Sequence, residues 1–148
     1  MIGLIIITNG NLALELKSAM EHIIGIQNNV AIFCITPDDD IDIQKKNIQK
    51  TIKEINEGNG IIILTDMFGG TPSNLALNFL KPGSIEIISG VNLPMLVKIG
   101  QSRDNSNILE VIQEGKSAAQ KYISIASEIL SENNDNSYYN NHWLIYLI

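Results

Sequence analysis

Four short apolar runs divide the chain at regular intervals, and polar or amphipathic stretches separate them. The runs are Ile2–Ile7, Val30–Ile35, Ile61–Thr65 and Ile85–Ser89. Each run is continuous rather than alternating, as is typical of parallel strands covered on both faces. Helical patterns lie between the runs. The chain is therefore predicted to have an α/β fold of three layers, in which helices flank a doubly wound, mainly parallel sheet.

Between the runs, apolar residues recur at helical spacing. A first helix is predicted to bury Leu12, Leu16, Ala19, Met20 and Ile23. A second helix is predicted to bury Ile41, Ile48, Ile52 and Ile55 and to end at Gly58. Each set falls on one face of a helix, and glycine is a common residue just beyond a helix end.

Three more helices follow in the second half of the chain. One should begin near Thr71-Pro72, because threonine is a good cap and proline at the first helical position loses no needed hydrogen bond. Asn92–Ile99 is predicted as a short helix and Ser106–Leu130 as a longer one. The inner seam of the longer helix is predicted to contain Leu109, Ile112, Ala119, Tyr122 and Ile129.

The chain changes character near residue 131. Residues 1–131 are predicted to form one domain, which suits a length of 148 residues. Residues 132–148 begin as a polar, asparagine-rich tether and end in the apolar segment His142–Ile148. We expect this segment to pair as an antiparallel edge strand, within the subunit or on a partner, because an exposed apolar strand promotes aggregation. It is too short to span a membrane.

Composition excludes several functional classes. The net charge is −6 and Arg103 is the only arginine, which argues against a nucleic-acid groove. Cys34 is the only cysteine, so an internal disulfide is impossible, and we interpret it as a small buried hydrophobe. Asp38–Asp40 are interpreted as helix-capping charges rather than metal ligands. The N-terminus resembles neither a signal peptide nor a membrane span, which predicts a cytoplasmic protein.

Candidate chemistry lies in two loops that follow the first and third strands, Thr8–Asn11 and Asp66–Asn74. Ligands of open α/β sheets bind at the carboxyl ends of the strands, and these loops meet there if the two strands are neighbours. Gly69 and Gly70 would let the backbone approach a ligand, and the Thr71 and Ser73 amides would form a small anion-binding nest. A tight strand-to-helix turn also accounts for the two glycines.

Two polar residues in these loops have both a structural and a functional interpretation. A carboxylate such as Asp66 at the end of an apolar strand is costly unless it is hydrogen-bonded, capping or functional. Asn9-Gly10 is a favourable turn pair, because asparagine tolerates left-handed backbone geometry. The residues alone leave both interpretations open.

Three stretches of the chain resemble a known family. Leu64–Asn74 closely resembles the second signature of the mannose-family IIA domains of the bacterial phosphoenolpyruvate-dependent sugar phosphotransferase system. Ser89–Leu96 resembles a third stretch of that family, and Ile5–Gly10 with the following helix resembles its opening. The similarity extends over residues 1–130 in order and spacing.

The resemblance implies a homodimer that takes a phosphoryl group from the histidine protein HPr and passes it to a IIB component. It implies a carrier histidine directly before the glycine after the first strand, and an orienting aspartate at Asp66. The implied phosphoryl-binding residues are Phe68, Gly69, Gly70, Thr71 and Ser73. No metal or cofactor is implied, because the donor is already a phosphohistidine. A C-terminal edge strand in family dimers would correspond to Trp143–Leu147.

The chain departs from this pattern at the carrier position, which holds Asn9. An imidazole nitrogen can accept a phosphoryl group, whereas the carboxamide nitrogen has a delocalised lone pair and is no nucleophile. His22, expected near the packed side of the first helix, and His142 in the tail are no obvious substitutes. We therefore expect a IIA component, a transferase by family, whose relay is inactive in this form.

Two alternatives remain open. The chain could be a non-catalytic regulatory or binding module of the same fold, which signals by binding. It could instead resemble the phosphocarrier subunit of a dihydroxyacetone kinase, which shares this fold, although the Phe68–Pro72 loop is more similar to the mannose branch. The intact Asp66, Gly69, Gly70 and Thr71 favour a recent loss of the carrier or a mutation over a decayed site.

Overall fold

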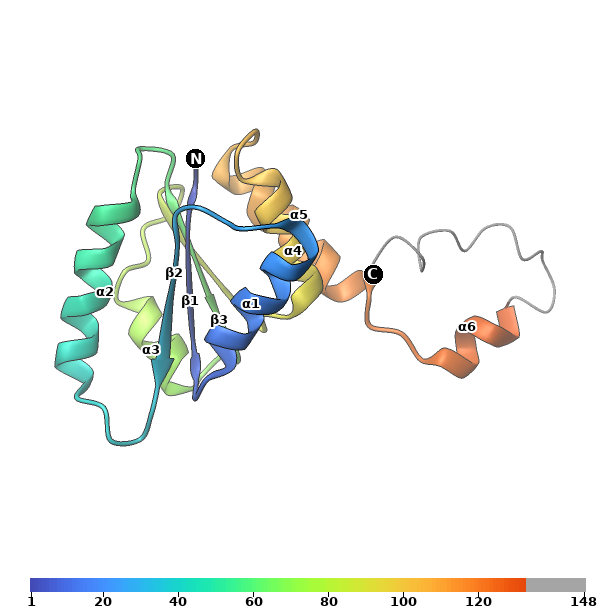
Figure 1. The fold of residues 1–148 in the computed structure, drawn as a ribbon, viewed down its shortest axis with the longest axis horizontal. Helices are drawn as coiled ribbons and strands as arrows, with labels where there is room; N and C mark the ends of the chain where they lie inside the picture. The colour runs from blue at the N-terminus through green and yellow to red at the C-terminus, as the bar shows by residue number, and fades with distance from the viewer. Residues whose placement is uncertain (133–148) are drawn as a thin grey trace.

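A four-stranded parallel sheet forms the centre of the computed structural model, which describes residues 1–132. Its strands are β1 (Gly3–Asn9), β2 (Val30–Ile35), β3 (Ile61–Thr65) and β4 (Ile85–Ser89). They lie in the order β2-β1-β3-β4, and all three pairings are parallel (Figure 1). The strand order reverses direction at β1, so the gap between β1 and β3 is the switch point at which such sheets bind ligands.

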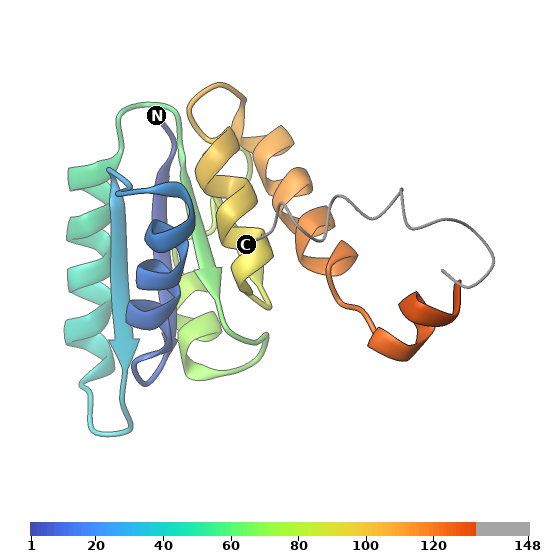
Figure 2. The ribbon, with the colours of Figure 1, turned by 45° about the vertical axis from the view of Figure 1, so that its right-hand side comes forward.

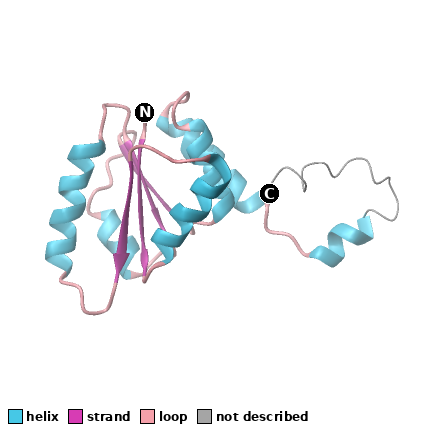
Figure 3. Cartoon of the chain, viewed as in Figure 1, coloured by secondary structure: helices cyan, strands magenta, loops and turns pink. Residues whose placement is uncertain are grey.

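Helices cover both faces of the sheet. They are α1 (Leu12–Ile24), α2 (Ile41–Ile55), α3 (Thr71–Leu77), α4 (Leu93–Ser102), α5 (Ile108–Lys121) and α6 (Ala126–Glu132). One core cluster joins α1, α4 and α5 to one face, and a second joins α2 and α3 to the other (Figures 1 and 3). Successive residues of β1 and β3 enter opposite clusters, which is why Leu4–Ile7 and Ile61–Leu64 are apolar at every position. The predicted three-layer α/β fold is confirmed.

The strand predictions agree closely with the structure. The boundaries of β2, β3 and β4 coincide with the predicted runs, whereas β1 begins one residue later and continues through Thr8 and Asn9. Asp40 caps α2 as expected, since its carboxylate accepts hydrogen bonds from Asp42 N and Ile43 N at 2.9 and 3.2 Å. Cys34 is half-buried and packs against one of the core clusters.

Helix ends are predicted less well. α2 ends at Ile55 rather than at Gly58, and the side chain of the following Asn56 accepts a hydrogen bond from Gly58 N at 2.9 Å. α3 begins at Thr71, but its cap is Gly70, without a side-chain hydrogen bond. The single helix predicted for Ser106–Leu130 is wrong. It is interrupted at residues 122–125, where Ile123, Ser124 and Ile125 have low helix propensity.

Several predicted inner faces are also wrong. Leu12, Ile23 and Ile41 are exposed, because they lie in terminal turns of α1 and α2. On α5, Leu109 is exposed, and the buried face consists of Ile108, Val111, Gly115, Ala118 and Ala119. Small residues face α4 because the two helices pack closely. A Cβ at Gly115 would lie only 2.7 Å from the Ile99 side chain of α4.

The predictions for the C-terminal segment and for membrane spans can be compared only with the described residues. The tether and edge strand predicted for residues 132–148 lie outside the described residues, apart from Glu132 at the end of α6. Among the helices of residues 1–132, none combines the length and the apolar character that a membrane crossing requires.

Arg103 holds the amino-terminal edge of the sheet together. It lies at the end of α4 and is only 2% exposed. One terminal nitrogen donates to Ile2 O at 3.1 Å and Asn29 O at 3.3 Å, and the other donates to Gln27 Oε1 and Asn28 O. Burial lowers the pKa of the guanidinium from its usual value, and the charges of Asp104 and Glu57 oppose that change. Backbone carbonyls therefore supply most of the compensation for burying this cation.

We expect Arg103→Met to lower the free energy of unfolding by about 3 kcal/mol, because it leaves several buried carbonyl groups with fewer donors. Urea denaturation at fixed protein concentration measures this loss. Lys46→Met, which removes an exposed cation from α2, is the matched control and should change stability little. Equal midpoints for the two variants would contradict the role assigned to Arg103.

Candidate functional site

Asn9 and Asp66 meet where β1 and β3 end side by side. Ile7 is paired with Thr65, so the residues that follow each strand emerge at the same edge of the sheet. Asn9 donates two hydrogen bonds to Asp66 Oδ2, one from its backbone N and one from Nδ2, both 2.8 Å long. Met67 N donates to the other carboxylate oxygen at 2.9 Å. The prediction that the two loops meet is confirmed, and the carboxylate of Asp66 is hydrogen-bonded through both oxygens.

The loop after β1 is anchored at both ends. Thr8 is fully buried, and its hydroxyl accepts a hydrogen bond of 2.7 Å from Ala13 N in the first turn of α1. Gly10 N donates to Ile35 O of β2 at 2.8 Å, and Gly10 takes the left-handed conformation with φ of +54°. The left-handed residue of the turn is therefore Gly10 rather than Asn9. Asn9 stays in the strand and lies exposed beside Asp66.

The loop after β3 is open to solvent. Met67 and Phe68 are 60% and 76% exposed, which is unusual for large apolar side chains. Gly69 has φ of +88° with open space around its Cβ position, so a tight turn explains this glycine. Gly70 has φ of −85° and caps α3, at whose first position Thr71 is exposed. The loop thus presents backbone and apolar groups next to the Asp66 carboxylate.

Ser73 is placed differently from the other candidate residues. It is fully buried, and among the described residues its hydroxyl has no hydrogen-bond partner. The candidates Phe68, Gly69 and Thr71 lie exposed, and Gly70 is half-buried. Of the predicted phosphoryl-binding residues, most therefore lie at the surface, whereas the Ser73 hydroxyl lies in the interior.

His22, the histidine in the described part of the chain, does not enter this site. His22 lies in the last turn of α1, about 15 Å along the helix from Leu12. Its side chain is exposed, so the expectation that it lies near the packed side of α1 is wrong. His142 lies outside the described residues.

Sequence reasoning missed the polar support that the end of β4 provides. Thr65 and Ser89 share a hydrogen bond of 2.8 Å between their hydroxyls. Gly90 N and Val91 N donate to Thr65 O at 3.0 and 2.9 Å. Asn92 caps α4 by accepting from Met95 N at 3.0 Å, and it donates to Ala119 O of α5 at 3.0 Å. The signal in the sequence was Ser89-Gly90-Val91-Asn92, in which a serine ends the strand and an asparagine precedes the next helix.

The site can bind through hydrogen bonds, but its central residue is not a nucleophile. The Asn9 carboxamide offers donors and an acceptor and has no reactive lone pair on nitrogen. Asp66 already accepts three N–H groups, two of them from Asn9. Within residues 1–132, no three His, Cys, Asp or Glu side chains are grouped so that they could hold a metal ion.

Comparison with known proteins relates this geometry to one family. Residues 3–116 match the family model EIIA-man, described as the fructose IIA component of the phosphotransferase system (PTS). A fructose-specific EIIA component from Bacillus subtilis is 28% identical over 133 residues, which are 89% of this chain and 91% of that protein. A mannose-specific EIIAB component from Escherichia coli is 33% identical over 107 residues, which are 70% of this chain but only 32% of that protein.

Solved structures agree with this assignment. A phosphotransferase system component EIIA from Streptococcus agalactiae superposes with a TM-score of 0.78 at 25% identity, covering 86% of this chain and 99% of that one. A PTS IIA protein associated with a fucose utilization operon of Streptococcus pneumoniae gives a TM-score of 0.75 at 27% identity, covering 86% and 95%. The match includes β1 to β4 and the loops that hold Asn9 and Asp66, since both lie inside residues 3–116.

We expect Asp66→Ala to lower the free energy of unfolding by about 1–2 kcal/mol, because Asn9 N and Met67 N lose their acceptor. Thermal and urea denaturation measure the change. Asp38→Ala, which removes an exposed carboxylate from the loop before α2, should cost less than half as much. If the two variants are equally stable, the hydrogen bonds of Asp66 do not hold the two loops together.

Proposed function

Since this chain belongs to the mannose-type IIA family of the bacterial sugar phosphotransferase system, we propose that it is a IIA component whose phosphoryl relay is interrupted at Asn9. The family as a whole relays a phosphoryl group. The proposed failure is in accepting the phosphoryl group at position 9, whereas the contact with Asp66 and the loop after β3 are retained.

The contact between the Asn9 side chain and Asp66 carries the proposal. Asn9 Nδ2 donates to Asp66 Oδ2 at 2.8 Å. A histidine at this position would donate one ring N–H to the same carboxylate and keep its other nitrogen free for attack on phosphorus. The carboxamide makes an equivalent hydrogen bond but has no second basic nitrogen. Asn9 would therefore preserve the geometry of the carrier position and remove its chemistry.

With a histidine at position 9, the ring nitrogen would attack the phosphorus of phospho-HPr in line. The bond from phosphorus to the HPr histidine would break as the new N–P bond forms, and Asp66 would stabilise the cationic ring. The phosphoryl oxygens would lie against the loop of Phe68, Gly69, Gly70 and Thr71. The exposure of Phe68, Gly69 and Thr71 supports this role. Ser73 would contribute only through its main-chain amide, because its hydroxyl is buried.

The proposed partners are phospho-HPr, a IIB component and a second copy of the chain. The exposed Met67 and Phe68 beside Asp66 support protein docking at this edge, since large exposed apolar side chains commonly mark interaction sites. The relay needs no metal, cofactor or nucleic acid, because each step passes the phosphoryl group between protein side chains. A cytoplasmic location follows from the same proposal, since phosphoenolpyruvate supplies the phosphoryl group there.

A regulatory or binding module is the second candidate function. The observation that favours it is the complete hydrogen bonding of Asp66 by Asn9 and Met67, which forms a stable polar pair without a nucleophile. Such a protein would keep its partner surface and act by occupancy rather than transfer.

We expect Asn9→His to accept one phosphoryl group when phosphoenolpyruvate, enzyme I and HPr are supplied, and the unchanged chain to accept none. Intact mass spectrometry detects the adduct directly, and a labelled family member confirms that the relay works. The Asn9→Ala variant is the matched control, because it removes the Asn9 carboxamide without introducing an imidazole.

No adduct on a folded Asn9→His variant would favour the regulatory module over an interrupted carrier. An adduct on the unchanged chain would show that the carrier is a residue other than Asn9. Circular dichroism melting of each variant establishes that it is folded.

In the Asn9→His background, we expect Asp66→Ala to slow phosphorylation by about a hundredfold, because the imidazole loses the group that orients it. The rate of adduct formation at saturating phospho-HPr reports this step. Asp38→Ala in the same background should leave the rate unchanged, since Asp38 lies in the loop before α2. A rate equal to that of the Asn9→His parent would remove Asp66 from the mechanism.

A further inference from the structure

The end of β4 holds the residue that directly precedes Asp66. Thr65 is paired with Ser89 in the register of β3 and β4, and their hydroxyls share a hydrogen bond of 2.8 Å. The carbonyl oxygen of Thr65 accepts hydrogen bonds from Gly90 N and Val91 N at 3.0 and 2.9 Å. Thr65 is fully buried, so the loss of a partner would leave a polar group away from water. The last residue of β3 is therefore fixed from the side of β4 through both its side chain and its main chain.

These contacts lie one residue away from the carboxylate of the candidate site. On its other side, Thr65 is paired with Ile7 of β1. Within the described residues, the Asp66 side chain accepts hydrogen bonds from Asn9 and Met67, and neither of them lies on β4. Asp66 is half-buried, and Asn9 and Met67 are exposed. The direction in which Asp66 leaves the sheet therefore depends on how firmly Thr65 is held.

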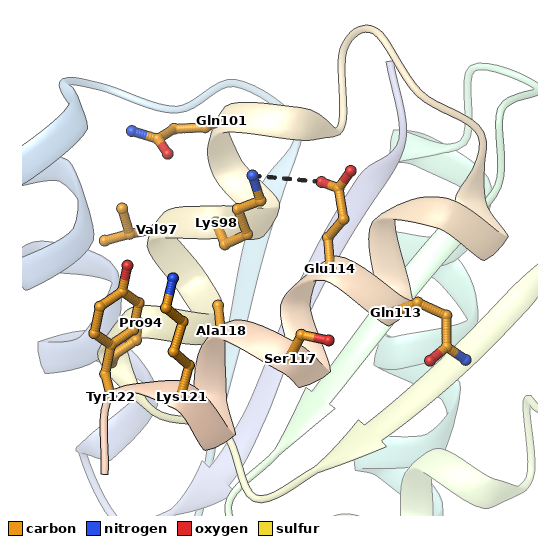
Figure 4. A pocket seen from close by; sticks show the side chains of 10 residues that line it. All are labelled: Pro94, Val97, Lys98, Gln101, Gln113, Glu114, Ser117, Ala118, Lys121 and Tyr122. Atoms are coloured by element: carbon orange, nitrogen blue, oxygen red, sulfur yellow. Dashed lines mark ion pairs between the residues drawn. The ribbon is translucent and has the colours of Figure 1, made fainter. Parts of the chain in front are cut away.

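The end of β4 is in turn connected to the packed helices α4 and α5. Asn92 precedes α4 and caps it, and its Nδ2 donates to Ala119 O of α5 at 3.0 Å. Figures 2 and 4 show the two helices side by side next to the sheet, and an ion pair of 3.7 Å between Lys98 and Glu114 also joins them. Ser89 thus belongs to a strand end that is anchored in a packed part of the domain, whereas the loop after β3 is open to solvent.

We propose that Ser89 is a positioning residue of the site, which acts through Thr65 on the carboxylate of Asp66. Its hydroxyl fixes the end of β3, and thereby the angle at which Asp66 meets the side chain at position 9. In an active relay, this angle decides how the ring N–H of a histidine is held and where its other nitrogen points. The kinetic consequence of this inference rests on the proposed function, whereas the position of Asp66 is measurable in the unchanged chain.

The first test needs no phosphoryl transfer. Nuclear magnetic resonance measures hydrogen exchange at the Asn9 amide, which donates to Asp66, and at the Gly10 amide, which donates to Ile35 O instead. In Ser89→Ala, we expect exchange at Asn9 to become about fivefold faster, which corresponds to roughly one net hydrogen bond. Exchange at Gly10 should not change. Equal acceleration at both amides, or no acceleration at Asn9, would overturn the proposal.

Two variants serve as matched controls for the loss of the hydroxyl. Ser89→Thr retains a hydroxyl at this position, so exchange at Asn9 should equal that of the unchanged chain. Ser102→Ala removes a serine hydroxyl that donates to Lys98 O at 2.9 Å at the end of α4, and it should also leave Asn9 unaffected. A response of Asn9 to Ser102→Ala as large as to Ser89→Ala would show that Ser89 has no particular link to Asp66.

A double variant separates positioning from stability. Ser89→Ala alone leaves the buried Thr65 hydroxyl without its partner, which itself costs stability. Thr65→Val combined with Ser89→Ala removes both hydroxyls, so the fold should lose little stability in urea denaturation. The double variant should nevertheless show the faster exchange at Asn9. If a stable double variant exchanges like the unchanged chain, the hydroxyl pair does not position Asp66.

The second test measures phosphorylation in the Asn9→His background. Ser89→Ala should lower the rate of adduct formation at saturating phospho-HPr by about fivefold, by the same reasoning of one hydrogen bond. The half-saturating concentration of phospho-HPr should stay the same, because Ser89 is half-buried beneath the exposed loops. Ser89→Thr should restore the rate. A higher half-saturating concentration with an unchanged maximal rate would assign Ser89 to docking and overturn the positioning role.

These outcomes distinguish the positioning role from the relay itself. If Asn9→His gains no adduct while exchange at Asn9 responds to Ser89→Ala, the proposed function fails and the positioning of Asp66 stands. If Asn9→His is phosphorylated at the same rate with and without Ser89→Ala, the relay stands and the positioning role is wrong.

Discussion

The parallel pairing of β1 with β3 is the constraint on which the candidate site depends. It brings Asn9 and Asp66, which are 57 positions apart, within 2.8 Å of each other. Two buried threonines secure the same edge, since Thr8 holds the first turn of α1 and Thr65 holds the end of β4. The hydroxyls of Thr8 and Thr65 and the carboxylate of Asp66 all have hydrogen-bond partners, which offsets the cost of placing polar groups at the end of an apolar sheet.

At the amino-terminal edge of the sheet, the buried side chain of Arg103 holds the chain segments together. Arg103 reaches from the end of α4 to the backbone of Ile2, directly before β1, and to the connection between α1 and β2. Its partners are mainly carbonyl oxygens, so it stabilises the fold by satisfying buried acceptors rather than by forming an ion pair. The contacts of Arg103 close the amino-terminal edge of the sheet. The carboxyl-terminal edge, with the loops after β1 and β3, is exposed and available for binding.

At position 9, the hydrogen bond to Asp66 and the ability to accept a phosphoryl group depend on different atoms of the side chain. Asn9 donates a side-chain N–H to Asp66, and a histidine ring N–H could make the same hydrogen bond. Phosphoryl transfer needs in addition a basic nitrogen that is not part of an amide.

The sequence by itself determined the strands and the three-layer class, and it predicted which residues belong to the candidate site. Continuous apolar runs and the polar residues that end them are local features, and β2, β3 and β4 have the predicted boundaries. It did not determine the inner face of α5, where Gly115 and Ala118 face α4 because close packing favours small residues there. It also could not show that Ser73 is buried, or that α6 separates from α5. The order of the strands and the meeting of Asn9 with Asp66 arise from contacts between distant segments, and only the tertiary structure decided them.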